Sequence, residues 1–570
     1  MKLLKTTILT AVAAAALGLT LPSCSDSFLD VTSKTGNNSG SITTPEQAES
    51  MLYGCYDAWK RTSSDDTWGF YVVSEIMSDE CFAGTGTSDA PQYAVIDRFD
   101  QGQHPTSVQL LSTAWRSYYT CIGRCNSLIA VCEGDQITWG DETVRARVIA
   151  EARLLRALCY FDMARMWENV PLMRTPEDDA NQPQADPDEL YTFIIEDLKF
   201  AQANIPADAY PKSDMANNEG RVTRYAADGL LARVYLYYTG FYGQEHPSLP
   251  KSDAVDALDD IIRSNEYELL ADFADLWPAA SSVSMPGDAE EWDAELTTYQ
   301  RVNREVILQM QFNYTDDRYN NYPGSSVSYE QQGNAWLVMF GLRKINCSPY
   351  GTGWGCGTVN PKTVKAFDET DPRRKASIID IEGEGIFDRL NAGTFDNKQD
   401  YMRDQREYTG YSIKKYLPTC WANGFSTIPE HHSTGAVMEY QTQPFVILRY
   451  ADVLLMAAEL GGTPSITAQA ALDKVRDRVG MPHVVANKDN IMKERQLELA
   501  FEANRYWDLM RQGIDVAANA VAENTTVLTG GREVRYTVNA ANFRAKRGLM
   551  QIPADQISLS GGVLKQNPGW

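Results

Sequence analysis

The chain has 570 residues, of which 43% are hydrophobic, and a formal net charge of −24. This length and apolar content can build a sizeable core, so the chain is predicted to be globular. The negative charge argues against a nucleic-acid partner and against attraction to anionic lipid head groups, and it favours neutral or cationic ligands.

The first 23 residues are predicted to be a signal peptide. Lys2 and Lys5 precede an apolar run at residues 8–21, which is shorter than the roughly 20 residues that span a bilayer. The sequence LPSC at residues 21–24 then resembles a bacterial lipobox, in which the cysteine is acylated. We therefore expect a lipid anchor at Cys24, with an ordinary secreted protein as the alternative. No later segment is apolar enough to be a candidate membrane span.

Nine cysteines remain after Cys24, and an odd number excludes a complete disulfide framework. Cys121, Cys125 and Cys132 recur at helical spacing and are predicted to be small apolar core residues. The five histidines are scattered or adjacent in a polar stretch. Neither residue type predicts a metal site, and no cofactor is expected.

Four stretches of the N-terminal half, taken as residues 24–276, are predicted to be helices because their apolar residues recur at helical spacing. They are residues 43–60, 114–134, 146–172 and 223–240. In the first, Thr44 and Gln47 form a capping box around Pro45, and in the last, Gly240 is expected to end the helix. Small residues on one helix facing aromatic residues on the next are typical of tetratricopeptide-like helix pairs. We therefore predict a mainly α fold with such pairs as its scaffold.

The second half of the chain, residues 277–570, begins differently. Residues 277–440 are rich in Gly, Pro, Asn, Ser, Tyr and Trp and lack helical periodicity. They are too aromatic for a disordered segment, so we predict a packed, loop-rich insertion. Helices are expected again at residues 445–460 and 490–513. These closing helices, over about 445–515, precede a C-terminal tail.

Four blocks of this sequence resemble, in order and spacing, the SusD/RagB family of outer-membrane nutrient-binding lipoproteins. They are residues 151–172, 447–460, 494–513 and 548–570. The resemblance implies a tetratricopeptide-like scaffold and an irregular region that carries the ligand site. It also implies a lipid-anchored protein of the cell surface, which covers a TonB-dependent SusC-like barrel as a lid.

The third of these blocks is predicted to be scaffold. Glu502–Arg505 and Asp508–Arg511 lie three residues apart and can pair along a helix. Glu498 and Glu502 could form an acid/base couple, but we expect them to lie on a solvated helix face.

A saccharide ligand needs aromatic platforms surrounded by polar side chains. Residues 65–89 and the insertion supply this mixture, and the glycines around Trp354 predict an exposed ring on a loop. The resemblance implies stacking on Trp354 and Tyr322 and a polar rim at residues 78–81. The predicted ligand-binding residues are Trp354, Tyr322, Asp79, Trp68, Phe82, Trp336 and Trp292, with Tyr319 as a weaker candidate. The alternative for each aromatic residue is a place in the core.

Three functions compete on this sequence. The leading one is non-catalytic binding of an oligosaccharide and its delivery to the SusC-like barrel. The second is capture of peptides by a RagB-type lipoprotein. The third is a surface glycoside hydrolase: no G-x-S-x-G, H-E-x-x-H or P-loop spacing is present, but a glycosidase needs only two positioned carboxylates.

Overall fold

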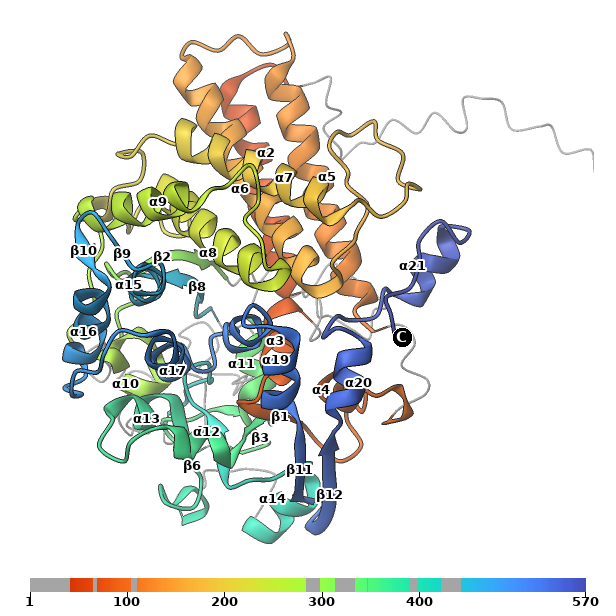
Figure 1. The fold of residues 1–570 in the computed structure, drawn as a ribbon, viewed down its shortest axis with the longest axis vertical. Helices are drawn as coiled ribbons and strands as arrows, with labels where there is room; N and C mark the ends of the chain where they lie inside the picture. Colours follow the sequence, from red (N-terminus) through yellow and green to blue (C-terminus); the bar gives the residue numbers. More distant parts are fainter. Residues whose placement is uncertain are drawn as a thin grey trace, which may run out of the picture.

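The computed structural model describes residues 42–64, 69–103, 110–282, 298–312, 334–345, 347–388, 397–421 and 442–570. Long helices from the N-terminal half gather at one end of the molecule, and short helices and strands occupy the other end (Figure 1). The mainly helical fold with a loop-rich region is therefore confirmed.

The scaffold consists of six long helices, in which consecutive members pack against each other. They are α2 (Pro45–Ser64), α5 (Ser112–Glu133), α6 (Glu142–Trp167), α7 (Pro187–Asn204), α8 (Arg224–Tyr242) and α9 (Lys251–Arg263). Their facing surfaces are mainly apolar, with a buried ion pair between Arg156 and Asp197. The nine cysteines of the described chain are all buried and free, Cys121, Cys125 and Cys132 among them.

The predicted helix starts are confirmed by their caps. The Gln47 side chain accepts a hydrogen bond from the Thr44 amide at 3.2 Å, and the Thr223 hydroxyl accepts one from the Ala226 amide at 3.1 Å. The predicted end at Gly240 is wrong, because α8 continues to Tyr242. A Cβ atom at Gly240 would collide with the backbone of Arg511, so this glycine permits close packing against another segment and does not end the helix.

Shorter helices make up the rest of the helical structure. They are α3 (Phe70–Ile76), α4 (Tyr93–Arg98), α10 (Pro278–Ser281), α11 (Ala335–Phe340), α12 (Pro361–Ala366), α13 (Pro372–Ser377), α14 (Lys398–Asp404), α15 (Tyr450–Glu459), α16 (Ala468–Arg478), α17 (Lys488–Glu498), α18 (Arg505–Met510), α19 (Ile514–Val521), α20 (Ala540–Ala545) and α21 (Ala554–Leu559), with 3₁₀ turns η3 (Gln101–Gln103), η4 (Lys212–Asp214), η5 (Phe273–Leu276) and η9 (Ile386–Asp388). Across the described ranges, no helix is both long and apolar enough to cross a membrane.

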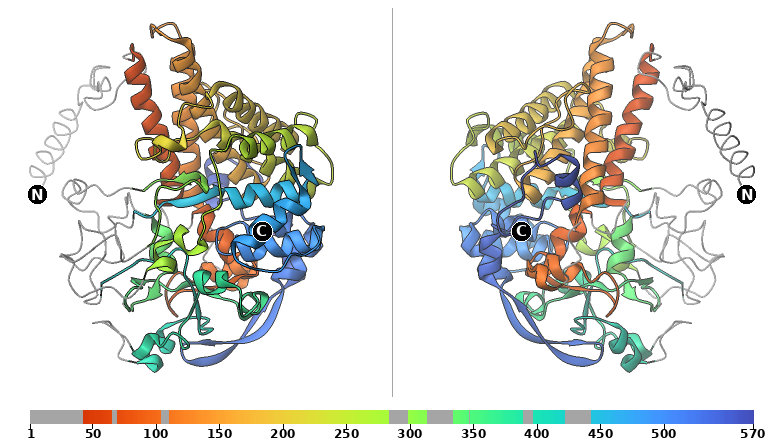
Figure 2. Two further views of the ribbon diagram at one scale, coloured as in Figure 1. Left: turned by 90° about the vertical axis from the view of Figure 1, so that its left-hand side faces the viewer. Right: turned by 90° about the vertical axis from the view of Figure 1, so that its right-hand side faces the viewer.

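The strands form one antiparallel sheet of four and several pairs. The sheet has the order β1 (Cys81–Gly84), β5 (Cys356–Val359), β7 (Tyr411–Ile413), β6 (Ile378–Asp380). The pairs are β2 (Val306–Met310) with β8 (Phe445–Arg449), β3 (Leu342–Arg343) with β4 (Thr352–Gly353), β9 (Gly462–Thr463) with β10 (Ile466–Thr467), and β11 (Glu523–Thr529) with β12 (Arg532–Val538). The β11–β12 hairpin curves under the lower end of the molecule (Figure 2).

Two of the predicted helices are interrupted. Residues 445–460 begin as strand β8, which pairs with β2, and become helical only at Tyr450. Residues 490–513 split into α17 and α18. Between these helices, the Phe501 amide donates a hydrogen bond to the buried Glu80 side chain and the Ala503 amide donates one to the buried Glu75 side chain, each at 3.0 Å. Phe501 and Ala503 both have a positive φ, which an α-helix does not allow.

The sequence predicted a solvated face for the acidic residues of α17 and the following turn, but these residues are buried. Glu498 and Glu502 are buried and share Arg449, with N–O distances of 2.6 and 2.8 Å. Arg505 pairs with Asp79 instead of Glu502, whereas Asp508 and Arg511 do pair, at 2.8 Å. The predicted solvated face is therefore wrong, and the carboxylates belong to a buried ion-pair network.

Candidate functional site

The candidate site is built around Trp354, on a glycine-rich turn between β4 and β5. The ring is half-buried against the main core. The turn needs its glycines: Gly355 has φ +69°, and a Cβ there would approach the Gln405 side-chain oxygen to 2.5 Å. Such a turn holds the tryptophan half-buried on a loop.

Arg343 lies beneath this turn and fixes its position. Its guanidinium donates to the Trp354 carbonyl oxygen at 3.3 Å and pairs with Asp404 at 2.6 Å and Asp89 at 2.7 Å. The Arg343 side chain is only 3% exposed, while that of Asp89 is 53% exposed. The exposed ammonium of Lys344 also pairs with Asp404, at 3.0 Å. Arg343 thus joins the Trp354 backbone to two carboxylates, one of which also binds an exposed ammonium group.

A surface loop from the N-terminal half, residues 85–90, is joined to the same turn. The Thr85 amide donates to the Gly355 carbonyl at 2.7 Å, and the Gln405 amide group donates to both the Thr85 and Gly355 carbonyls. Thr87, Ser88 and Asp89 of this loop are exposed. An indole can stack on a sugar ring, and hydroxyl and carboxylate groups can bond its hydroxyls, so the turn and the loop joined to it supply both kinds of group.

Behind the loop, two buried carboxyl groups hold strand β1. Asp97 accepts a hydrogen bond from the Ala83 amide at 3.1 Å. Glu407 accepts one from the Gly84 amide at 2.9 Å and also forms an ion pair with Arg98 at 2.6 Å. Burial, followed by repulsion from Glu407, raises the pKa of Asp97 to about 7. Because both groups are buried and bound to backbone amides, we assign them to the support of the site.

Asp404 has the opposite electrostatic environment. Partial burial would raise the pKa of its carboxyl group, but hydrogen bonds from Arg343 and Lys344 lower it below the usual value. A general acid in a glycosidase needs a raised pKa, so Asp404 suits electrostatic binding rather than proton donation. No cluster of side chains in the described ranges is arranged to hold a metal ion.

The structure separates the predicted ligand residues. Phe82 and Trp336, each 3% exposed, are core residues: Phe82 packs edge-on to Tyr536, and Trp336 stacks on Phe445 with ring centroids 4.6 Å apart. Neither can offer a ring face to a ligand, so these two predictions are wrong. Asp79 has both carboxylate oxygens bound by Arg505, at 2.7 and 2.8 Å.

The other predicted residues cannot be placed in the same way. Outside the described residues lie Trp68, Tyr322, Trp292, Tyr319 and Cys24, the residue predicted to carry the lipid anchor. The sequence did not point to Arg343, Asp89, Asp404 or Gln405 as site residues. Only Asp89 carried a signal, because it follows the glycine- and threonine-rich sequence GTGTS at residues 84–88.

A helical scaffold that carries an aromatic ring and a polar rim on loops defines a class of ligand-binding proteins, and the comparisons identify the family. The family described as "SusD family" matches residues 304–570, and the family described as "Starch-binding associating with outer membrane" matches residues 27–236. The chain therefore belongs to the SusD-like family.

Several individual relatives are similar to this chain. A "SusD-like protein" of Bacteroides ovatus is 24% identical over 413 residues, which cover 70% of this chain. The same alignment covers 65% of that relative's length, which is less than two thirds. "SusD-like protein P38" of Formosa agariphila is 23% identical over 505 residues, covering 82% of this chain and 84% of that relative.

Solved structures share the fold over nearly the whole chain. A "Laminarin binding SusD-like protein" has a TM-score of 0.69 at 26% identity, and "Surface glycan-binding protein A from Bacteroides fluxus" has a TM-score of 0.71 at 23% identity. Each alignment covers 93% of this chain and 100% of the other.

Proposed function

We propose that this protein binds an oligosaccharide at the cell surface without cleaving it and delivers it to a TonB-dependent SusC-like barrel in the outer membrane. The observation that carries the proposal is the half-buried Trp354 ring on its glycine-rich turn, with Asp89 and Lys344 exposed nearby. An aromatic ring can stack on the C–H face of a sugar, and polar side chains can bond its hydroxyls.

The relatives support a glycan ligand. One solved neighbour is named as laminarin-binding, and another, at 23% identity, is described in complex with laminarihexaose. Laminarihexaose is therefore the first probe for calorimetry, followed by an array of other glycans and of peptides. Binding to peptides but to no glycan would overturn the proposal in favour of a RagB-type peptide carrier.

The absence of cleavage needs its own experiment. The protein is incubated with the oligosaccharide that binds best, and new reducing ends are measured over a day. We expect none, because Asp89 and Asp404 are both engaged with Arg343. Reducing ends that persist after further purification would instead indicate a glycoside hydrolase.

The anchor and the barrel partner are parts of the same proposal. Acylation of Cys24 predicts that Cys24→Ala moves the protein from the outer-membrane fraction to soluble fractions. Co-purification from detergent-solubilised outer membrane tests the SusC-like partner. A Cys24→Ala protein that stays anchored at wild-type levels would overturn the proposed lipidation.

A further inference from the structure

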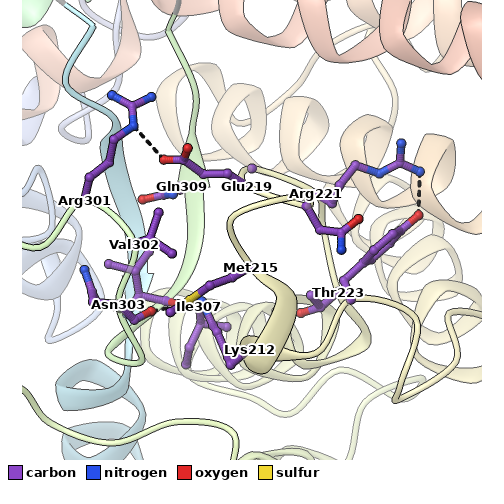
Figure 3. Close-up of a pocket in the computed structure, with 14 residues that line it drawn as sticks. Lys212, Met215, Glu219, Arg221, Thr223, Arg301, Val302, Asn303, Ile307 and Gln309 are labelled. Atoms are coloured by element: carbon purple, nitrogen blue, oxygen red, sulfur yellow. Dashed lines mark hydrogen bonds and ion pairs between the residues drawn. The ribbon is translucent and has the colours of Figure 1, made fainter.

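A small hollow lies away from Trp354, between the connection from α7 to α8 and strand β2 (Figure 3). Its volume is about 40 Å³, which holds a few water molecules at most. The cations that line it already have partners: Arg301 pairs with Glu219 at 2.8 Å, and the Lys212 ammonium donates to the carbonyl oxygen of Asn303 at 3.3 Å. This hollow is too small for a sugar ring, so we assign it to the packing of the fold.

A larger, open groove lies where α5 meets α21 and the connection from α6 to α7. Helix α21 projects from the right-hand side of the molecule (Figure 1). The groove has a volume of about 720 Å³, within the range of about 300–1,000 Å³ for small-molecule sites. Its lining comes from residues 115–126, 171–181 and 556–564. It therefore shares no element with the candidate site at Trp354.

Side-chain hydrogen bonds fix the three segments of the groove to one another. On α5, the Tyr119 hydroxyl and the Asn126 amide donate to carbonyl oxygens of the α6–α7 connection, at 2.7 and 3.1 Å. At the start of α5, the Ser112 hydroxyl donates to the carboxylate of Asp555 in α21 at 2.6 Å. The groove is thus formed by contacts within the chain, and a preformed site lowers the entropic cost of binding a ligand.

One face of α5 forms the floor of the groove. Each of four lining residues lies three or four positions from another, so they share one side of the helix. They are Arg116, Tyr119, Thr120 and Gly123. The Tyr119 ring is half-buried, and Trp115 packs against it with ring centroids 5.4 Å apart. Gly123 has open space above it, because an added Cβ atom would have no neighbour within 4 Å. The floor therefore combines an aromatic ring with a position where a ligand can approach the helix backbone.

The lining as a whole combines apolar surface with uncharged polar groups. Among the described residues that line the groove, only Arg116 and Asp179 are charged, and their charges cancel. Leu559, on the wall formed by α21, is 78% exposed and offers apolar surface to the groove. The uncharged polar groups are hydroxyls and amides, and they belong to Thr120, Asn126, Thr175, Asn181, Gln556 and Ser560.

This composition selects among classes of ligand. An acyl chain would cover the hydroxyls and amides without giving them hydrogen-bond partners, which costs free energy. A charged ligand would meet no net opposite charge in the lining. A neutral oligosaccharide has C–H faces for the apolar surface and hydroxyls for the polar groups, so it satisfies both parts of the lining.

We propose that this groove is a second oligosaccharide site, in which the Tyr119 ring stacks on a sugar face and the hydroxyl and amide side chains bond the sugar hydroxyls. The proposal rests on the proposed function, because it gives the groove a ligand of the same class. Since the groove offers one aromatic ring, we expect it to bind more weakly than the site at Trp354.

Calorimetry with laminarihexaose, maltohexaose and xylohexaose tests the proposal. The Tyr322→Ala, Trp354→Ala double variant is the background, because the first site is disabled in it. We expect the wild type to bind two molecules of at least one hexasaccharide per chain and the double variant to bind one. A leucine dipeptide with blocked ends is the probe for an apolar peptide and should not bind.

A substitution that fills the groove identifies the remaining site. Gly123→Gln, added to the double variant, should weaken the remaining binding at least tenfold. The melting temperature should not fall, because the position is open and glutamine favours a helix more than glycine does. Gly54→Gln is the matched control and should bind normally: Gly54 lies within α2, outside the groove, and an added Cβ there also has no neighbour within 4 Å.

The role of the ring is tested in the same background. Tyr119→Phe keeps the ring and should retain affinity, whereas Tyr119→Ala should lose about five- to thirtyfold. Equal losses in the two variants would overturn stacking on Tyr119.

The other outcomes separate this inference from the proposed function. Equal binding by the Gly123→Gln and Gly54→Gln proteins overturns the groove as a site. Binding by the wild type but not by the double variant leaves one site and overturns the inference alone. If the wild type binds none of the three hexasaccharides, the inference fails, and the proposed function then depends on the remaining glycans of the array. Binding of the dipeptide alone, lost in Gly123→Gln, would make the groove a peptide site and overturn the glycan assignment.

Discussion

In the helical scaffold, α5 to α8 meet mainly through apolar side chains, with a buried ion pair between Arg156 of α6 and Asp197 of α7. Around Trp354 the arrangement is different, because short strands and loops from three distant parts of the chain are joined by charged and amide side chains. Arg343 contacts Asp89 and Asp404, and Gln405 bonds two carbonyls. The helical scaffold is stabilised mainly by the burial of apolar side chains. In the region around Trp354, a few hydrogen bonds and ion pairs supply partners for the polar groups of the loop backbone.

A buried ion-pair network forms a third region, which joins elements of the second half of the chain. Arg449 at the end of β8 contacts Glu305, Glu498 and Glu502, and Arg478 and Arg373 also reach Glu498. The combined attraction of these arginines outweighs burial and keeps the pKa of Glu498 far below its usual value. Such a network gives orientation rather than net stability, because desolvation offsets much of its attraction.

The largest expected effect comes from breaking this network. Arg449→Met leaves three buried carboxylates without their shared cation, so the free energy of unfolding should fall by about 3–5 kcal/mol. Denaturant titration measures the loss. Arg263→Met is the matched control: its side chain is 61% exposed and pairs with Asp259 and Asp260, so it should cost less than about 1 kcal/mol. Equal losses would contradict the structural role assigned to Arg449.

The pH dependence of stability should be set by buried acids. Burial raises the pKa of Glu75 to about 7 even though the Ala503 amide acts in the other direction. The folded state therefore holds a proton that the unfolded state releases above about pH 4.5, and stability should decrease as the pH rises from about 4.5 to 7. In Glu75→Gln, the loss of unfolding free energy between pH 4.5 and pH 7 should be smaller by about 3 kcal/mol. The control Glu142→Gln changes an exposed residue and should leave this loss unchanged. An unchanged profile in Glu75→Gln would exclude that residue as the cause.

The same contrast explains which elements could be predicted from sequence. Helices with local caps and apolar periodicity, such as α2 and α8, were predicted within a few residues. The break between α17 and α18 could not be predicted, because it depends on Glu75 and Glu80, more than 400 residues away in the chain. Strand β8 was mistaken for helix because an apolar run of that kind fits either state, and only its pairing with β2 decides between them.

The candidate site was predictable to a smaller extent. The glycines beside Trp354 predicted an exposed ring on a loop; the turn is present, but Trp354 is half-buried. Phe82 follows the polar residues SDEC, whereas Trp336 precedes the apolar residues LVMF, which favour a place in the core. Their burial depends on Tyr536 and Phe445, which approach only in the folded chain. Arg343 was missed because its partners come from two other segments.

The tryptophans of the two environments should respond in opposite ways. Trp354→Ala should reduce oligosaccharide affinity by about 1–2 kcal/mol, roughly five- to thirtyfold, with little change in melting temperature. Trp336→Ala removes a ring from the core and should instead lower stability by about 3–5 kcal/mol. Calorimetry and thermal melts separate the two effects. Full affinity in Trp354→Ala, and in the Tyr322→Ala, Trp354→Ala double variant, would assign both rings to packing.

The smallest effect is expected at the rim, where Asp89 and Asp404 share Arg343. Asp89→Asn removes one exposed charge but keeps an acceptor oxygen, so stability should change by less than about 1 kcal/mol. Asp404→Asn should cost more, because Asp404 is less exposed and also pairs with Lys344. If Arg343 positions the Trp354 turn mainly through Asp404, Asp404→Asn should also reduce oligosaccharide affinity more than Asp89→Asn does. A larger loss of affinity in Asp89→Asn, without loss of stability, would instead mean that Asp89 contacts the sugar directly.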